Sequence, residues 1–150
     1  MSALSLPRTV SAAVLAAAGL AVSLPGPATA QPAAMPGDRS VAVTVRNHTD
    51  LRLSLSDKDL VEGDWTKVPP KAVKRLAVAK FGSESIDDQG GTEATVTYST
   101  LYGEVELYWR NPWSRDNEFT CDAPEELECE VVDGGLGTHP KVTFNIRDAD

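Results

Sequence analysis

The stretch Glu104-Val105-Glu106-Leu107-Tyr108-Trp109-Arg110-Asn111-Pro112-Trp113-Ser114-Arg115-Asp116-Asn117 decides the fold class of this chain. Val105, Leu107 and Trp109 share one parity, and polar residues and a tyrosine take the other. This period of two is typical of a strand with one buried face. Pro112 ends the strand because proline lacks the N–H that a sheet ladder needs. Trp113 then lies in a polar loop, where a large amphipathic ring is a candidate contact.

Similar short alternating runs follow one another along the chain, separated by Gly, Pro, Asn and Asp. We expect strands over 41–46, 51–56, 73–81, 93–98, 104–109, 130–132 and 142–146. The first two are expected to form a hairpin, and Leu76 and Val78 share one face of the third. Residues 57–72 and 82–91 are expected to be polar loops, and 122–130 at most a turn of helix. The pattern predicts an all-β fold, a single antiparallel β-sandwich, with a closed barrel as the alternative.

The first thirty residues have the composition of a secretory signal peptide. Arg8 is basic, residues 10–24 form an uncharged run rich in Ala and Leu, and residues 28–30 match a small-x-small cleavage site. The run is too short for a retained membrane helix. We therefore expect a signal peptide over 1–30, a flexible lead-in over 31–40, a sandwich domain over 41–150, and a secreted, extracellular protein.

The charge balance disfavours some classes of partner. Residues 1–30 hold one Arg and no acid, so residues 31–150 carry 13 Lys and Arg against 22 Asp and Glu, a formal charge of −9. Nucleic acid is disfavoured because phosphates need a basic face. Simple electrostatic docking on anionic lipid is disfavoured for the same reason, which leaves aromatic contacts or specific headgroup recognition for any membrane.

The cysteines and acidic residues yield few candidate sites. Cys121 and Cys129 are the only cysteines, and an even number at short spacing in a secreted chain predicts one disulfide. Their spacing does not match a zinc site, so we expect no metal and no cofactor. The loop with acidic residues at 84, 87 and 88 is interpreted as solvated, with Ca²⁺ binding as the alternative.

An enzymatic function finds little support in the sequence. No Gly-x-Ser-x-Gly motif is present, and no motif selects one pair among the 22 acidic residues for glycoside hydrolysis. A disulfide between the two cysteines would remove the thiol nucleophile. We therefore expect a protein that is not an enzyme.

Several short motifs occur in a recognisable order and spacing. They are Val45-Arg46-Asn47-His48-Thr49, Gly63-Asp64-Trp65 before Pro69-Pro70, Phe81-Gly82-Ser83-Glu84-Ser85, Gly91-Thr92-Glu93-Ala94 before Val96 and Tyr98, and Tyr108-Trp109 with Pro112-Trp113 and Asn117. Together they cover most of residues 41–119 and resemble the aegerolysin family of small, acidic, secreted β-sandwich proteins.

The resemblance implies a sandwich that binds membrane lipids with neutral or sphingolipid-type headgroups, and that in some relatives acts with a larger pore-forming partner protein. Two departures stand out. Relatives usually have a Pro-Gly turn where this chain has Val73-Lys74-Arg75-Leu76, and an apolar stretch where it has the acidic Ile86-Asp87-Asp88-Gln89.

Four residues are candidates for lipid binding: Trp65, Tyr108, Trp113 and Asn117. For each there is a purely structural alternative, which is a loop anchor for the tryptophans, solvation for Tyr108 and a turn for Asn117. The leading functional hypothesis is a secreted, non-enzymatic lipid-binding protein, the lipid-recognising component of a two-protein cytolysin. The alternative is a secreted protein-binding or inhibitor module.

Overall fold

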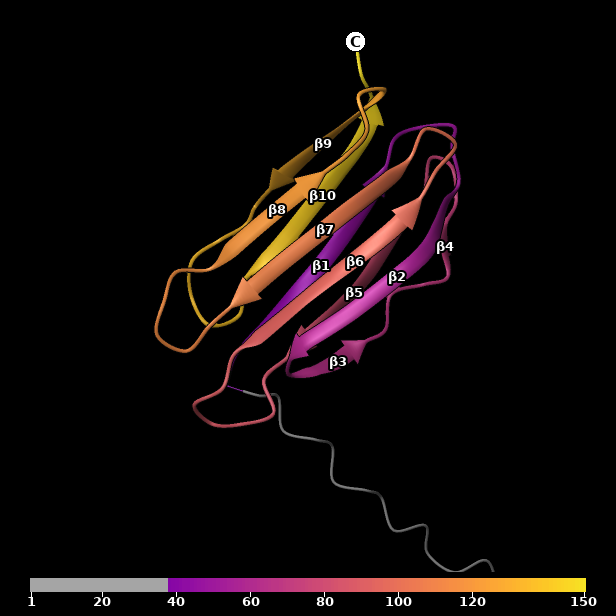
Figure 1. Ribbon diagram of the computed structural model, residues 1–150. Helices are drawn as coiled ribbons and strands as arrows, with labels where there is room; N and C mark the ends of the chain where they lie inside the picture. Colours follow the sequence, from indigo (N-terminus) through magenta and orange to yellow (C-terminus); the bar gives the residue numbers. More distant parts are fainter. Residues whose placement is uncertain (1–37) are drawn as a thin grey trace, which may run out of the picture. The chain divides into compact units, whose positions relative to one another are not determined.

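The computed structural model describes residues 38–150; the expected signal peptide and most of the lead-in lie outside the described residues. The described part contains ten strands and no helix, and they form two five-stranded sheets packed face to face (Figure 1). The first sheet has the order β3-β5-β1-β10-β9 and the second β4-β2-β6-β7-β8. The bounds are β1 Ser40–Asn47, β2 Leu53–Glu62, β3 Asp64–Lys67, β4 Ala72–Val73, β5 Val78–Glu84, β6 Thr92–Ser99, β7 Glu104–Asn111, β8 Glu118–Asp122, β9 Leu127–Val132 and β10 Lys141–Asp148.

This architecture confirms the predicted β-sandwich. Every strand pair is antiparallel except β1 with β10, which is parallel. No helix in residues 38–150 is long and apolar enough to cross a membrane.

The hairpin expected between the first two strands is wrong, because β1 and β2 lie in different sheets. The buried Asn47 makes the corner between the sheets. Its Nδ2 donates to the carbonyl oxygens of Leu51 at 2.8 Å and of Lys74 at 3.0 Å, and its Oδ1 accepts from the Thr49 hydroxyl at 2.7 Å. The turn residues therefore direct the chain across the sandwich.

The expected loops were too long. Residues 57–72 contain the second half of β2, all of β3 and the first residue of β4, and the expected loop 82–91 begins only after β5 ends at Glu84. The segment expected to hold at most a turn of helix instead contains the end of β8 and the start of β9. The second half of β2 and all of β3 are largely exposed, so no buried face imposes the alternation that marks a strand. β8 does alternate, but over only five residues whose inward side chains are half-buried.

The core is built from strands that do alternate. In β7, Val105, Leu107 and Trp109 are fully buried, as their shared parity predicted, and Tyr98 of the neighbouring β6 is buried beside them. The Trp109 Nε1 donates to the Ser83 hydroxyl at 2.8 Å, which satisfies the one polar atom of the indole. The core thus lies between the sheets, and Trp109 is its largest fully buried side chain.

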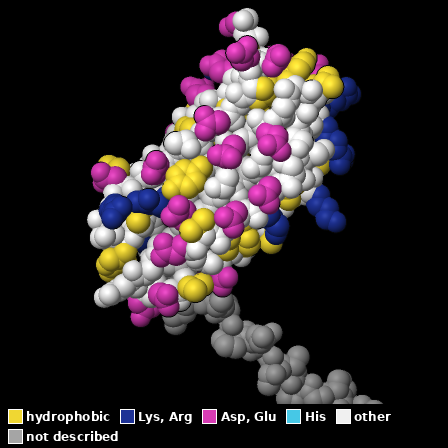
Figure 2. Space-filling model, in the orientation of Figure 1, with side chains coloured by type: hydrophobic (Ala, Val, Ile, Leu, Met, Phe, Trp, Pro, Cys, Tyr) yellow, Lys and Arg dark blue, Asp and Glu magenta, His cyan; other side chains and the backbone are white. Residues whose placement is uncertain are grey.

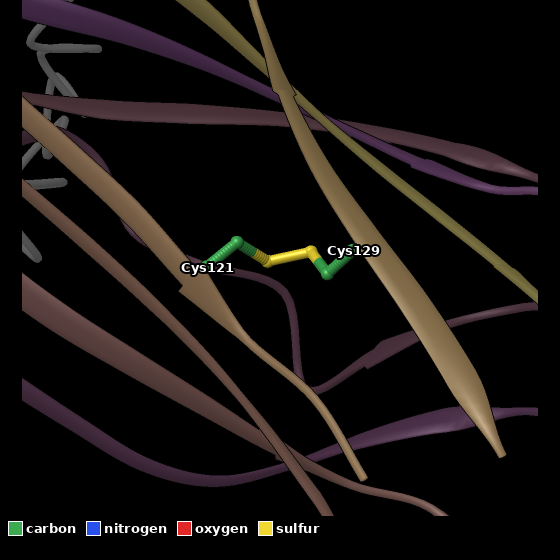
Figure 3. Close-up of a disulfide and its surroundings, with 2 residues drawn as sticks. All are labelled: Cys121 and Cys129. Carbon is green, nitrogen blue, oxygen red and sulfur yellow. A yellow bond between two sulfur atoms is a disulfide. The ribbon is translucent and has the colours of Figure 1, made fainter. Parts of the chain in front are cut away.

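The predicted disulfide is present and joins the two sheets. Cys121 of β8 and Cys129 of β9 are bonded, with a Cα–Cα distance of 5.8 Å (Figure 3). Because β8 and β9 are the edge strands of the two sheets on the same side, the bond closes that side of the sandwich.

Candidate functional site

Three loops meet at the end of the sandwich where β7 ends and β1 begins (Figure 1). We call this region the tryptophan end; it consists of Arg39 and the loops 85–91, 112–117 and 133–140. The Ser85 N–H donates to the Arg39 carbonyl at 2.8 Å, and the Arg39 Nη1 donates to the Asn111 Oδ1 at 2.9 Å. The Asn111 Nδ2 donates to the Thr138 carbonyl at 2.8 Å. Each loop is therefore tied to the others by hydrogen bonds.

Arg39 fixes the position of Trp113. Its guanidinium lies 5.4 Å from the centroid of the Trp113 ring, and its Nη2 donates to the Trp113 carbonyl oxygen at 2.7 Å. The ring itself remains 44% exposed. Trp113 is thus held in place by a cation and a backbone contact, and much of its apolar surface stays in water.

The neighbouring loops add apolar and cationic groups at the same end. Ile86 in loop 85–91 is 66% exposed and Leu136 in loop 133–140 is 86% exposed. A shallow hollow of about 250 Å³ is lined by Arg39, Arg115 and Leu136 among others. Apolar tips beside two guanidinium groups make a surface suited to an amphipathic ligand.

Asn117 is also at the tryptophan end, and its side chain is committed to the loop structure. Its Nδ2 donates to the carbonyl oxygens of Gly135 at 3.1 Å and Gly137 at 3.0 Å. This residue therefore holds loop 133–140 against the loop that carries Trp113, and positions the surface.

Trp65 lies in strand β3, not in the loop expected for it. Its ring packs edge-on against the Trp109 ring at a centroid distance of 5.9 Å and an interplanar angle of 71°. Phe81 contacts the other side of this cluster, with its centroid 6.0 Å from that of Trp109. Lys58 lies over the half-buried Trp65 ring at 5.9 Å. Trp65 is therefore integrated with the core.

Tyr108 lies on the outer face of the second sheet. Its hydroxyl donates to the Glu93 Oε1 at 3.1 Å. Desolvation, followed by this hydrogen bond and the charge of Glu93, raises the pKa of the phenol. The structure thus brings two of the four candidates, Trp113 and Asn117, together at one end and places Trp65 and Tyr108 in other surroundings.

Sequence reasoning missed two parts of this end. Arg39 was assigned to the lead-in, and it contacts Trp113 across 74 positions, a separation that no local pattern reveals. Leu136 lies in a segment with no strand signal. Asp87 and Asp88 are exposed in loop 85–91, and no group of three or more His, Cys, Asp or Glu within 38–150 is arranged to hold a metal ion.

Comparisons with known proteins bear on the fold. No family model matches the chain, and no curated protein matches it in sequence. Among solved structures, the lipid binding protein Nakanori is similar with a TM-score of 0.60 and 14% identity, over 72% of this chain and 70% of that chain. IP-1A from Alcaligenes faecalis is similar with a TM-score of 0.60 and 17% identity, over 77% of this chain and 94% of that chain. These two similarities show that the fold of this chain is shared with known structures.

Proposed function

We propose that this is a secreted, non-enzymatic protein that binds membrane lipids peripherally through the tryptophan end. The observation that carries the proposal is Trp113, whose ring stays 44% exposed while Arg39 fixes its position. Tryptophan favours the boundary between headgroups and acyl chains because one end of it is apolar and the other polar. Ile86 and Leu136, exposed on the adjacent loops, extend the apolar contact.

The ligand class we propose is a lipid with a neutral or sphingolipid-type headgroup. The resemblance to aegerolysins and the fold shared with a protein described as lipid binding support it. Arg39 and Arg115, which line the hollow at the tryptophan end, offer guanidinium groups to the phosphate of a zwitterionic headgroup.

We further propose that the protein recognises the lipid for a larger, pore-forming partner protein. The motif resemblance supports this division of labour. In this scheme the chain binds the target lipid, and the partner protein forms the pore.

Liposome co-sedimentation tests the proposal, with vesicles that are neutral, rich in sphingolipid, or bear phosphoethanolamine. A tryptophan buries about 150–250 Å², so covering the exposed part of Trp113 at about 25 cal/mol per Å² contributes about 2 kcal/mol. Trp113→Ala is therefore expected to weaken binding about thirtyfold. Tyr102→Ala is the matched control, because Tyr102 is 46% exposed in the turn between β6 and β7, at the opposite end.

Equal weakening by both substitutions would remove the tryptophan end from the proposal. Failure to bind any of these vesicles would favour the alternative, a module that binds another protein. The outer face of the second sheet favours that alternative, since it carries Glu104 and Glu106 on β7 and Glu118 and Asp122 on β8. Figure 2 shows acidic side chains spread over the visible face of the molecule.

A further inference from the structure

One stretch of this acidic chain is strongly basic. The chain has a formal charge of −8, yet residues 65–83 contain no Asp or Glu. The same stretch holds five of the 14 Lys and Arg residues of the chain: Lys67, Lys71, Lys74, Arg75 and Lys80. All five side chains are exposed. The ion pairs found within residues 38–150 join Arg147 to Glu128 and Glu130, and none of the five cations takes part in them.

The fold gathers these cations at the side of the sandwich opposite the disulfide, where the edge strands β3 and β4 lie. A hollow of about 340 Å³ opens there, with Lys67, Lys74 and Lys80 around apolar groups that include Val73 and Ala79. In Figure 2 most of the visible Lys and Arg side chains gather along the edge where β4 lies in Figure 1, while Asp and Glu cover the facing surface. The charge of the molecule is therefore strongly polarised.

The turn between β4 and β5 projects an apolar side chain from this basic side. Leu76 has φ 51°, a left-handed conformation that a leucine rarely adopts, and its side chain is 68% exposed. The turn is held rigidly: the Asn47 side chain donates to the Lys74 carbonyl, the Asn47 N–H to the Ala77 carbonyl, and the Leu76 N–H to the Thr49 carbonyl. A strained residue whose side chain is mostly exposed points to a role outside the fold.

Leu76 and Val78 were expected on one face of a strand, and the structure corrects that expectation. Leu76 lies at the turn, and Val78, at the start of β5, is 56% exposed. Val68, which lies in the chain between Lys67 and Pro70 of the hollow, is 50% exposed. The same stretch of chain thus presents three exposed aliphatic side chains and five exposed cations.

We propose that this basic edge, defined as Lys67, Lys71, Lys74, Arg75 and Lys80 with Val68, Leu76 and Val78, docks on an anionic phospholipid membrane surface. Lysine and arginine are attracted to the surface potential of anionic lipid, and each contributes about fivefold to the partition coefficient. The aliphatic side chains enter the headgroup layer between the charges. Charge complementarity selects this occupant over an uncharged surface.

The net negative charge of the chain does not prevent this docking. The Debye length is about 8 Å at physiological ionic strength, so acids on the far faces of the sandwich are screened from a membrane that touches the basic edge. Only the charges within that distance of the surface decide the interaction. A negative net charge therefore does not exclude anionic lipid as a partner for this side of the molecule.

Binding to two vesicle compositions tests the inference. One is phosphatidylcholine alone, and the other has a third of that lipid replaced by phosphatidylserine; neither contains sphingolipid or phosphoethanolamine lipid. The joint replacement of Lys74→Gln and Arg75→Gln is expected to weaken binding to the anionic vesicles about 25-fold, from fivefold per cation. The joint replacement of Lys141→Gln and Arg147→Gln is the control, because it makes the same change in net charge at two exposed positions of β10, next to the opposite edge strand β9, and is expected to leave binding unchanged.

Leu76→Gly separates docking from folding. Glycine adopts positive φ without strain, so this variant is expected to keep or raise the melting temperature while it weakens binding to anionic vesicles. A fall in melting temperature with unchanged binding would show that Leu76 serves the fold.

Equal binding to both vesicles, or equal loss in the two double variants, would overturn the proposal. Binding that is unchanged between 0.1 M and 1 M salt would do the same, because the Debye length falls from about 10 Å to about 3 Å over that range. If the protein is retained on immobilised poly-glutamate but binds neither vesicle, the partner of the basic edge is an acidic protein and the membrane proposal is wrong. Trp113→Ala should still bind the anionic vesicles, so this inference and the function proposed for the tryptophan end fail separately.

Discussion

Replacing Trp109 by alanine should destabilise the sandwich more than any other single truncation of its aromatic residues. The ring is fully buried between the sheets, where it contacts the rings of Trp65 and Phe81. Alanine would leave a cavity among strands of both sheets, and the sheet hydrogen bonds limit how far the strands can close it. The expected cost is about 3–5 kcal/mol, the range measured for large aromatic truncations in cores.

The hydrogen bond of the indole adds little to this cost. Ser83, whose hydroxyl accepts from the Trp109 Nε1 at 2.8 Å, also accepts from the Thr92 hydroxyl at 2.6 Å. The serine therefore keeps a partner when the indole is removed. Trp109→Phe, which retains most of the ring volume, is expected to cost about 1–2 kcal/mol.

Urea unfolding followed by circular dichroism measures these differences without relying on tryptophan fluorescence. With a slope of about 2 kcal/mol per molar urea, a loss of 4 kcal/mol lowers the midpoint by about 2 M at unchanged slope. Since domains of this kind are stable by only about 5–15 kcal/mol, Trp109→Ala approaches the limit of folding.

Trp113→Ala is the matched comparison at the tryptophan end. It loses the contact with Arg39, which is worth about 0.5–1 kcal/mol, and less buried surface than at the fully buried Trp109, because Trp113 is already 44% exposed. The stability lost should therefore be clearly smaller than for Trp109→Ala. Similar losses in the two variants would refute the reasoning, because they would make Trp113 part of the core.

Three further predictions concern the fold and its action. Burial raises the pKa of the Tyr98 phenol above its usual 10.0, so stability present below about pH 10 is lost as the pH rises further; Tyr98→Phe should flatten that loss, and equal urea midpoint shifts between about pH 9 and pH 11 would contradict it. Joint replacement of Cys121→Ser and Cys129→Ser should cost about 2.5 kcal/mol by loop-closure entropy, and titration of two reactive thiols in the wild type would disprove the bond. The pure protein should release no dye from vesicles that it binds, because the apolar faces of its central strands are buried in the shared core; rapid dose-dependent leakage would show that it perforates unaided.

The sequence predicted the strands whose two faces differ. In β1, β6, β7 and β10 a buried face alternates with a polar or half-exposed one, so the period of two is visible in the residues themselves. It did not predict β3 or β8, which are four and five residues long and lie at sheet edges. In β3 pairing with β5 imposes the extended conformation with little burial, and in β8 the alternation is too short to stand out from the surrounding polar residues.

Contacts between distant segments account for the other errors. The cluster Asn47–Asp50 has the composition of a hairpin turn, yet Asn47 bonds to Lys74, 27 positions away, and the chain crosses to the other sheet. At the tryptophan end, the Asn-Pro break correctly predicted that Trp113 lies outside the strand. Its orientation depends on Arg39, which a single sequence places in a featureless segment.

Net charge is a sum over the chain, whereas a membrane responds to the charges that lie within about a Debye length of it. If the 14 cations were spread evenly among the 22 acids, every surface would be acidic and would be repelled by anionic lipid. Residues 65–83 break that assumption, since they hold five cations and no acid in one continuous stretch. Their strands lie at one open edge, so the fold preserves the separation of charge that the sequence already contains. The two double variants have the same net charge and should nevertheless differ in their binding to anionic vesicles. That difference shows the effect of where the charges lie, because the net charge is held constant.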